Sequence, residues 1–171
     1  MTESESAPSS SWRRFTAFYA QFLTMLLAAT VAILIVPVTL QIVSRYTALI
    51  PSYIWTEEMA RFLFIWMVMI GAMIGVRESS HFEVDVWPNL SRRGEAAVRL
   101  FARLGTLLLA LVFVWAGTEF TRFAWYRTSE LADLPLWLIH VAWPVTGITW
   151  IVFLGEQFVD EARVLLGRRI P

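Results

Sequence analysis

The stretch from Trp55 to Asp85 decides the fold, and it reads WTEEMAR (55–61), FLFIWMVMIGAMIGV (62–76) and RESSHFEVD (77–85). A charged segment precedes fifteen uncharged, mostly apolar residues, and a polar segment with a histidine follows them. Fifteen residues rise only about 22 Å as a helix, less than the roughly 30 Å hydrocarbon core of a membrane. The 22 positions from Trp55 to Val76 are enough to cross it if the first charges lie at one interface. This stretch therefore predicts a membrane-spanning helix with a charged start.

The whole chain has the composition of an integral membrane protein. Of its 171 residues, 57% are hydrophobic and 16% are charged, which is too apolar for a soluble domain of this size. Fourteen arginines are balanced by fourteen acidic residues, so the net charge indicates neither a nucleic-acid nor an acidic partner. The sequence contains no cysteine, and it therefore has no disulfide framework and no thiolate metal site.

Four apolar runs are each long enough to cross a membrane, and the segments between them are short. They predict an all-α integral membrane protein whose four transmembrane helices form a small bundle. The predicted spans are residues 22–43, 55–76, 100–121 and 134–155. Residues 19–166 then make a single membrane domain between an N-terminal tail (1–18) and a C-terminal tail (167–171).

Three segments need separate comment. The first apolar run could be a signal peptide, but it is longer than the usual apolar core of one and lacks a convincing small-residue cleavage site. The polar, Ser-rich residues 1–11 cannot bury enough apolar surface to fold, so they are expected to be disordered. Residues 82–99 combine alternating apolar and acidic positions with Pro88 and Gly94, and the sequence does not decide their conformation.

The arginines predict the orientation in the membrane. With four spans, both termini lie on one side, which carries ten arginines against four on the other. Short cytoplasmic loops carry the excess of positive charge, so both termini are predicted to be cytoplasmic. The four outer arginines are Arg45, Arg61, Arg122 and Arg127.

The two histidines limit the classes of cofactor and enzyme. His81 follows the second span on the inner side, whereas His140 lies about two turns into the fourth span from the outer side. Roughly 20–30 Å would separate them, so they cannot ligate one haem iron or one metal ion. His140 is expected to be a hydrogen-bonded histidine near the interface. Since phosphate loops, catalytic triads and zinc-ligand spacings are also missing from the sequence, it predicts no enzyme and no cofactor.

The carboxylates before the second span have two interpretations. Glu57 and Glu58 stand four and three residues before Arg61, so both can reach it along one helix. They could form an ion or proton site, or a self-paired group near the positive end of the helix. We favour the self-paired group because no chain of ionisable residues continues into the membrane.

Three residues of the second span are candidates for helix packing. Gly71 and Gly75 are four apart beside Ala72, a small-residue face that allows close approach of another helix. Trp66 lies inside the span rather than at its ends, which favours packing within the bundle, or contact with lipid or a partner.

The order and spacing of these features resemble one family. The matching residues are Arg45-Tyr46, Trp55, Glu57-Glu58, Arg61, Trp66 and Gly71, then Arg77, His81, Val84 and Asp85, and finally Pro135–Trp137, Trp143-Pro144 and Gly147. In this order the chain resembles the small membrane subunit, DctQ-like, of tripartite ATP-independent periplasmic (TRAP) transporters. The block from 45 to 85 is the most specific part of the resemblance.

The resemblance implies a multi-pass protein of a bacterial inner membrane that scaffolds a large, multi-span permease subunit. A periplasmic binding protein would deliver an organic acid, and an ion gradient would drive uptake; no nucleic acid is implied. The alternative function is a membrane anchor or assembly subunit of a respiratory complex, which would need a haem or quinone. Residues expected at the periplasmic surface are Arg45, Tyr46, Trp55, Glu57, Glu58 and Arg61, and those expected at the cytoplasmic turn are Arg77, His81 and Asp85.

Overall fold

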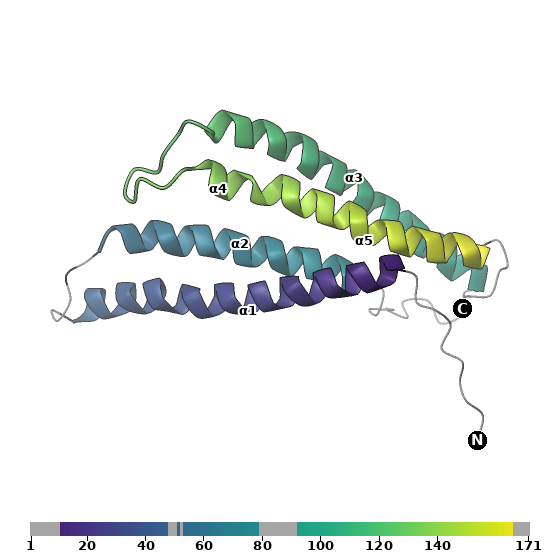
Figure 1. Ribbon diagram of the computed structural model, residues 1–171, viewed down its shortest axis with the longest axis horizontal. Coiled ribbons are helices and arrows are strands. Elements are labelled where there is room, and N and C mark those ends of the chain that lie inside the picture. Colours follow the sequence, from purple (N-terminus) through teal and green to yellow (C-terminus); the bar gives the residue numbers. More distant parts are fainter. Residues whose placement is uncertain (1–10, 48–50, 52, 79–91, 166–171) are drawn as a thin grey trace, which may run out of the picture.

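The computed structural model describes residues 11–47, 51, 53–78 and 92–165, and most of them are helical (Figure 1). The helices are α1 (Ser11–Tyr46), α2 (Trp55–Glu78), α3 (Arg92–Ala124), α4 (Trp137–His140) and α5 (Ala142–Leu165). Strand pairing in this part of the chain is limited to an isolated bridge between Thr128 and Pro135. The all-α class predicted from the sequence is confirmed.

The described residues contain four segments long and apolar enough to cross a membrane. These are Trp12–Tyr46, Trp55–Glu78, Leu100–Ala124 and Trp137–Phe158. Each overlaps one of the four predicted spans, so the four-span prediction is also confirmed. The fourth span is divided, because α4 ends at His140 and α5 begins at Ala142. Pro144 then lies in the first turn of α5, where its missing N–H costs no helical hydrogen bond.

Helix α1 begins earlier than the sequence predicted. Residues 11–18, predicted as part of the N-terminal tail, are helical. Thr16 explains the difference, because it is fully buried and its hydroxyl donates a hydrogen bond of 2.8 Å to the Glu156 carboxylate. Of the segment left undecided at 82–99, residues 92–99 belong to α3, and the remainder lies outside the described residues.

The long helices pack in the order α3, α5, α2, α1 (Figure 1). Among the described residues, no Cα atom of α3 comes within 8 Å of one in α1 or α2. The α4–α5 span and α2 are therefore the inner spans, and the α4–α5 span is the more buried: 39% of its most apolar segment is buried, compared with 17% in α2 and 11% in α1 and in α3. The contact between α2 and the α4–α5 span thus holds the α1–α2 pair against the α3–α5 pair.

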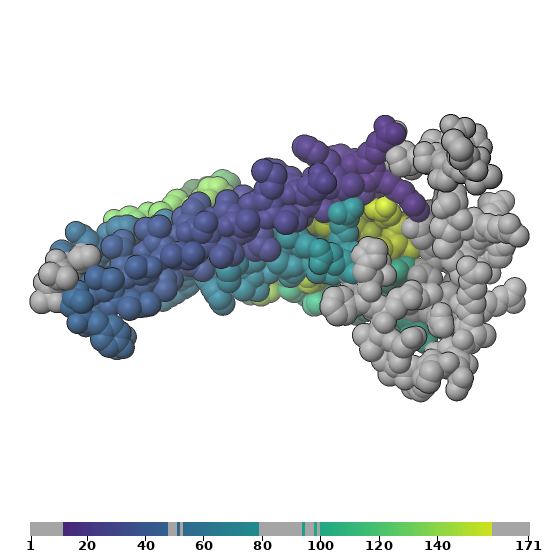
Figure 2. Space-filling view, turned by 90° about the horizontal axis from the view of Figure 1, so that it is seen from below, coloured from purple at the N-terminus to yellow at the C-terminus, as the bar shows by residue number. Residues whose placement is uncertain are grey.

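Helix α1 contacts its neighbours, chiefly α2 and at its N-terminal end α5, through a regular seam. Its least exposed residues recur at alternating steps of four and three, the spacing of helices that pack side by side at a shallow angle. The seam residues are Thr16, Ala20, Leu23, Leu27, Thr30, Leu34, Pro37 and Gln41. The rest of α1 is largely exposed along its length, as Figure 2 shows for one face of the molecule.

Two glycines allow α3 and α5 to approach closely. A Cβ atom added to Gly117 would lie 2.6 Å from Cδ of Pro144, and one added to Gly147 would lie 2.6 Å from the Ala110 carbonyl oxygen. Both distances are far below van der Waals contact, so only glycine fits these positions. The sequence resemblance included Gly147 but did not assign it a packing role.

Gly71 and Gly75 behave differently. A Cβ atom added to either would meet nothing within 4 Å. Inside the described part of the chain they therefore do not make the close helix contact that their spacing suggested. That Gly71 and Gly75 pack against a helix stays a prediction, and the helix would belong to another protein.

Helices α2 and α5, with α4, are joined by three side chains that donate to backbone carbonyls. Trp66 Nε1 donates to the Leu138 carbonyl (2.9 Å), and Trp150 Nε1 donates to the Ala72 carbonyl (3.0 Å). Gln157 Nε2 donates to the Val76 carbonyl at 2.9 Å. On α2 the three bonds lie between the middle of the helix and its C-terminal end, and each one fixes the register of the helices. We call them the α2–α5 bonds; one of them joins Trp66 to the Leu138 carbonyl of α4, and the helix-packing role of Trp66 stays a prediction.

Candidate functional site

The outer end of the molecule, defined as the end where α2 begins, collects most of the residues singled out in the sequence. The C-terminus of α1, the first turn of α2 and the loop from α3 to α4 all lie there (Figure 1). Arg45 and Tyr46 end α1, and Tyr46 is 81% exposed. Trp55 begins α2, packs near the Tyr53 ring and is 44% exposed.

The two adjacent carboxylates of α2 have different partners. Glu57 pairs with Arg61 at 3.3 Å, one helical turn away, and both side chains are exposed. Glu58 is only 6% exposed and points to another part of the chain. Its carboxylate accepts hydrogen bonds from the backbone N–H groups of Leu131 (3.2 Å) and Ala132 (2.7 Å). Of the two glutamates predicted to pair with Arg61, Glu57 forms the ion pair and Glu58 binds the loop backbone instead.

The loop that Glu58 holds is also closed by its own hydrogen bonds. The Ser129 N–H donates to the Leu134 carbonyl (2.8 Å), and the Leu134 N–H donates to the Ser129 hydroxyl (3.1 Å). The Leu136 N–H donates to the Arg127 carbonyl at 3.0 Å. Asp133 turns the chain with a φ of 50°, a conformation that Asp tolerates better than most residues. We call residues 125–136 the clamped loop.

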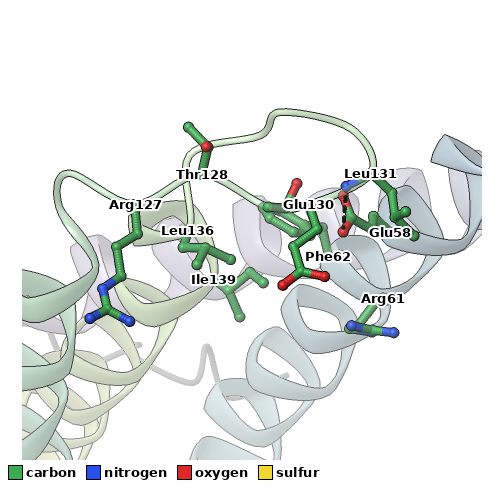
Figure 3. Close-up of a pocket in the computed structure, with 10 residues that line it drawn as sticks. Glu58, Arg61, Phe62, Arg127, Thr128, Glu130, Leu131, Leu136 and Ile139 are labelled. Atoms are coloured by element: carbon green, nitrogen blue, oxygen red, sulfur yellow. Dashed lines mark hydrogen bonds between the residues drawn. The ribbon is translucent and has the colours of Figure 1, made fainter.

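A hollow of about 720 Å³ lies between α2, the clamped loop and the start of α4 (Figure 3). We call it the outer hollow. It is lined by Glu58, Arg61 and Phe62 of α2, by residues 127–131 of the loop, and by Leu136 and Ile139. In Figure 3 the Glu130 side chain projects between Arg61 and Arg127. The lining thus carries both signs of charge above an apolar base.

The outer hollow is lined by charges of both signs. Among the described residues there is no group of three His, Cys, Asp or Glu side chains able to hold a metal ion. A small organic anion placed in the hollow would face the carboxylates of Glu58 and Glu130 as well as two arginines. Mixed charge of this kind complements another protein surface that also carries both signs.

The predicted inner turn is only partly described. Arg77 lies in the last turn of α2, with its guanidinium carbon 5.9 Å from the centre of the Phe153 ring. His81 and Asp85 lie outside the described residues. His140, at the outer end, hydrogen-bonds through Nδ1 to the Leu136 carbonyl at 2.8 Å, as expected for an interfacial histidine.

Sequence reasoning missed Ser129 and the acceptor role of Glu58. Ser129 is 7% exposed although it lies in a polar connection, and Glu58 contacts a loop more than 70 residues later. One feature of the sequence could have indicated this contact. Two adjacent glutamates, Glu57 and Glu58, stand near a single arginine, Arg61, so one of the two carboxylates is expected to bind a different group.

Comparison with known proteins places these features in one family. Residues 34–164 match the family model described as "Tripartite ATP-independent periplasmic transporters, DctQ component". The chain is 27% identical to the sialic acid TRAP transporter small permease protein SiaQ of Vibrio cholerae, across 83% of this chain and 80% of that protein. It is 33% identical to the C4-dicarboxylate small permease protein DctQ of Rhodobacter capsulatus, across 55% of this chain and 43% of that one.

One further relative is much longer. The isethionate TRAP transporter permease protein DctMQ of Oleidesulfovibrio alaskensis is 25% identical across 81% of this chain, which covers only 23% of that protein's length. In that relative, the segment similar to this chain is therefore continuous with a much larger protein.

Proposed function

Because the chain belongs to the DctQ family of TRAP transporters and is an inner-membrane small permease subunit, we propose that it acts as a rigid scaffold for the large transport subunit. The transporter would take up an organic acid, delivered by a periplasmic binding protein and driven by an ion gradient. Isethionate, C4-dicarboxylates and sialic acid, named in the relatives, are all organic acids, which supports this class of solute.

The observation that carries the scaffold proposal is the set of α2–α5 bonds. Carbonyl groups of α2 and α4 accept hydrogen bonds from side chains of the facing helix, at positions from the middle of α2 to its C-terminal end. Sliding or rotation of one helix would break several of these bonds together, in surroundings where water is scarce. A protein held in this way is suited to supporting a moving partner rather than moving itself.

The inner end of the molecule adds to this rigidity. Glu156 of α5 accepts a hydrogen bond from Thr16 and lies 3.8 Å from the Arg13 guanidinium, which ties α1 to α5. The Tyr19 and Thr149 hydroxyls lie 2.9 Å apart and link the same two helices. These groups pair with each other across α1 and α5.

Copurification tests the proposal. A tagged copy of the chain, expressed in cells that also make the large subunit and extracted in mild detergent, should retain a membrane protein of about a dozen spans, as the family resemblance implies. Uptake into cells should require both proteins. A chain that transports the solute without any large subunit would contradict the scaffold role, and a haem spectrum in the purified protein would support the respiratory alternative instead.

A further inference from the structure

A second hollow, of about 370 Å³, lies between α1 and α2 at the inner end of the molecule, and we call it the inner hollow. The N-terminal part of α1 and the C-terminal part of α2 run side by side there (Figure 1). The inner hollow is lined by Ala20, Gln21, Thr24 and Met25 of α1 and by Ile74, Arg77 and Glu78 of α2. It shares no lining residue with the outer hollow, so it is a separate site near the opposite end of α2.

The lining of the inner hollow changes from polar to apolar along the two helices. Arg77 and Glu78 lie in the last turn of α2, whereas Ile74 lies one turn deeper in the span. On α1, which runs in the opposite direction, Gln21 precedes Met25 by about one turn. The polar side chains thus lie toward the membrane surface and the apolar ones toward the hydrocarbon core. A phospholipid has the same order of polar and apolar parts.

The polar end of the inner hollow carries one positive and one negative side chain. Arg77 is partly buried, and the contact of its guanidinium with the Phe153 ring holds the cation beside the hollow. Glu78 is exposed and makes no ion pair within the described residues. A guanidinium binds a phosphate through paired hydrogen bonds, and a carboxylate binds an ammonium group that donates to it. The two side chains can therefore bind a ligand that carries both charges.

The depth of this polar end matches the headgroups of a bilayer. Arg77 and Glu78 end the second of the four segments able to cross a membrane. Beyond Gln21, toward the inner end, α1 carries the exposed Trp12. Tryptophan collects at the membrane–water interface, and basic side chains near that interface attract lipid phosphates. The inner hollow therefore opens where a headgroup meets its acyl chains.

The charges of the inner hollow distinguish among common headgroups. Phosphatidylethanolamine carries a phosphate followed by a primary ammonium, so it complements Arg77 and Glu78 together. Phosphatidylglycerol carries a phosphate alone, which Arg77 attracts and Glu78 repels. The quaternary ammonium of phosphatidylcholine has no N–H group to donate to the carboxylate. An ethanolamine lipid thus fits the hollow best.

We propose that the inner hollow binds one phosphatidylethanolamine molecule from the leaflet at the inner end of the bundle. The lipid phosphate pairs with Arg77 and accepts a hydrogen bond from the Gln21 side chain, and the ammonium pairs with Glu78. One acyl chain lies along Met25 and Ile74. Because this chain alone forms the site, the inference goes beyond the scaffold role and does not depend on a large subunit. A lipid bound there stabilises the contact between the inner ends of α1 and α2.

Native mass spectrometry of the full chain, purified in mild detergent and stripped of lipid, tests the site. The probes are phosphatidylethanolamine, phosphatidylglycerol and phosphatidylcholine with identical acyl chains, and each is titrated alone. The first molecule of phosphatidylethanolamine should bind with a dissociation constant about tenfold lower than those of the other two lipids. The difference arises because only its headgroup pairs with both charges of the hollow.

Two variants assign the binding to the hollow. Arg77→Gln removes the phosphate partner and should weaken the binding of all three lipids about tenfold. Glu78→Gln should weaken only the binding of phosphatidylethanolamine, and it should therefore abolish the preference among headgroups. Arg14→Gln is the matched control, because Arg14 is an exposed arginine near the same end of α1 that does not line the hollow. Its dissociation constants should stay within about twofold of wild type.

Either of two outcomes would overturn the lipid site. One is a wild-type chain that binds phosphatidylethanolamine no more tightly than the other two lipids. The other is a preference for phosphatidylethanolamine that the Glu78→Gln variant retains, since the lipid would then bind elsewhere. Should Arg77→Gln disturb the packing against Phe153, Glu78→Gln still decides, because Glu78 is exposed. Copurification with a large subunit tests the scaffold role separately, so the failure of one proposal leaves the other standing.

Discussion

At the scale of single residues, Glu57 and Glu58 show how neighbours in sequence acquire different roles. They are 100° apart around a helix, so one faces solvent beside Arg61 and the other faces the clamped loop. A carboxylate that accepts two backbone N–H groups orders the loop more strongly than an exposed ion pair orders a helix, because surface pairs contribute little. Glu58 is therefore the residue on which the shape of the outer hollow depends most.

Replacing Glu58 tests this dependence. Glu58→Ala should free the amides of Leu131 and Ala132, and their hydrogen exchange should become roughly tenfold faster or more, because loop opening no longer breaks these bonds. Glu58→Gln, which keeps one acceptor oxygen, should lie in between. The measurement is hydrogen–deuterium exchange of the purified chain by mass spectrometry.

Glu57→Ala is the control for this experiment, since it removes an equivalent carboxylate that touches only Arg61 among the described residues. Exchange of the loop amides should match wild type. If Glu58→Ala and Glu57→Ala gave the same exchange, the clamp would have no part in ordering the loop.

At the scale of helices, the four glycines discussed above fall into two pairs. Gly117 and Gly147 lie where α3 and α5 touch, while Gly71 and Gly75 of α2 have open space beside them. The four-residue spacing of Gly71 and Gly75 therefore does not predict where two helices of the described chain approach most closely. Single glycines on different helices make that contact, and their position depends on how the two helices are aligned.

Alanine substitutions separate the two pairs. Gly117→Ala and Gly147→Ala should each destabilise the isolated chain by about 1–3 kcal/mol, because the added methyl group overlaps atoms of the facing helix. Gly71→Ala and Gly75→Ala should cause no loss, since nothing lies within 4 Å of the added group. Thermal unfolding in one detergent compares all four variants, and equal stability across them would contradict the close α3–α5 contact.

At the scale of the whole molecule, the open order of the helices leaves the outer faces of α1 and α3 without a partner in the described chain. Exposed side chains include Phe18 (70%) and Met25 (73%) of α1, and Phe101 (79%) and Trp115 (73%) of α3. In a membrane, such faces are covered by lipid or by another protein. Helix α1 would rise about 52 Å over its 35-residue span, so it tilts or extends beyond the hydrocarbon core.

The topology can be tested directly because the chain has no native cysteine. Arg14→Cys, near the start of α1, and Thr128→Cys, in the clamped loop, are both at exposed positions. With both termini cytoplasmic, a membrane-impermeant thiol reagent should label only the Thr128 variant in intact cells. Both variants should label after the membrane is permeabilised. Labelling of the Arg14 variant in intact cells would reverse the orientation predicted from the arginines.

The sequence by itself determined the four spans, the all-α class and the family resemblance. These properties depend on the local sum of hydrophobicity along about 20 residues and on the order of charged and aromatic residues between spans. Neither needs any knowledge of which helix lies beside which. The resemblance between 45 and 85 was likewise readable from spacing alone.

Only the tertiary structure decided which helices touch and which polar groups meet. The bonds from Glu58 to Ala132, Trp150 to Ala72 and Gln157 to Val76 join residues more than 70 positions apart. Such pairs depend on the alignment of whole helices, to which every packed side chain contributes a little, so no local pattern reveals them. For the same reason the close contact lies at Gly117 and Gly147, where the helices cross, although the sequence pattern pointed to Gly71 and Gly75.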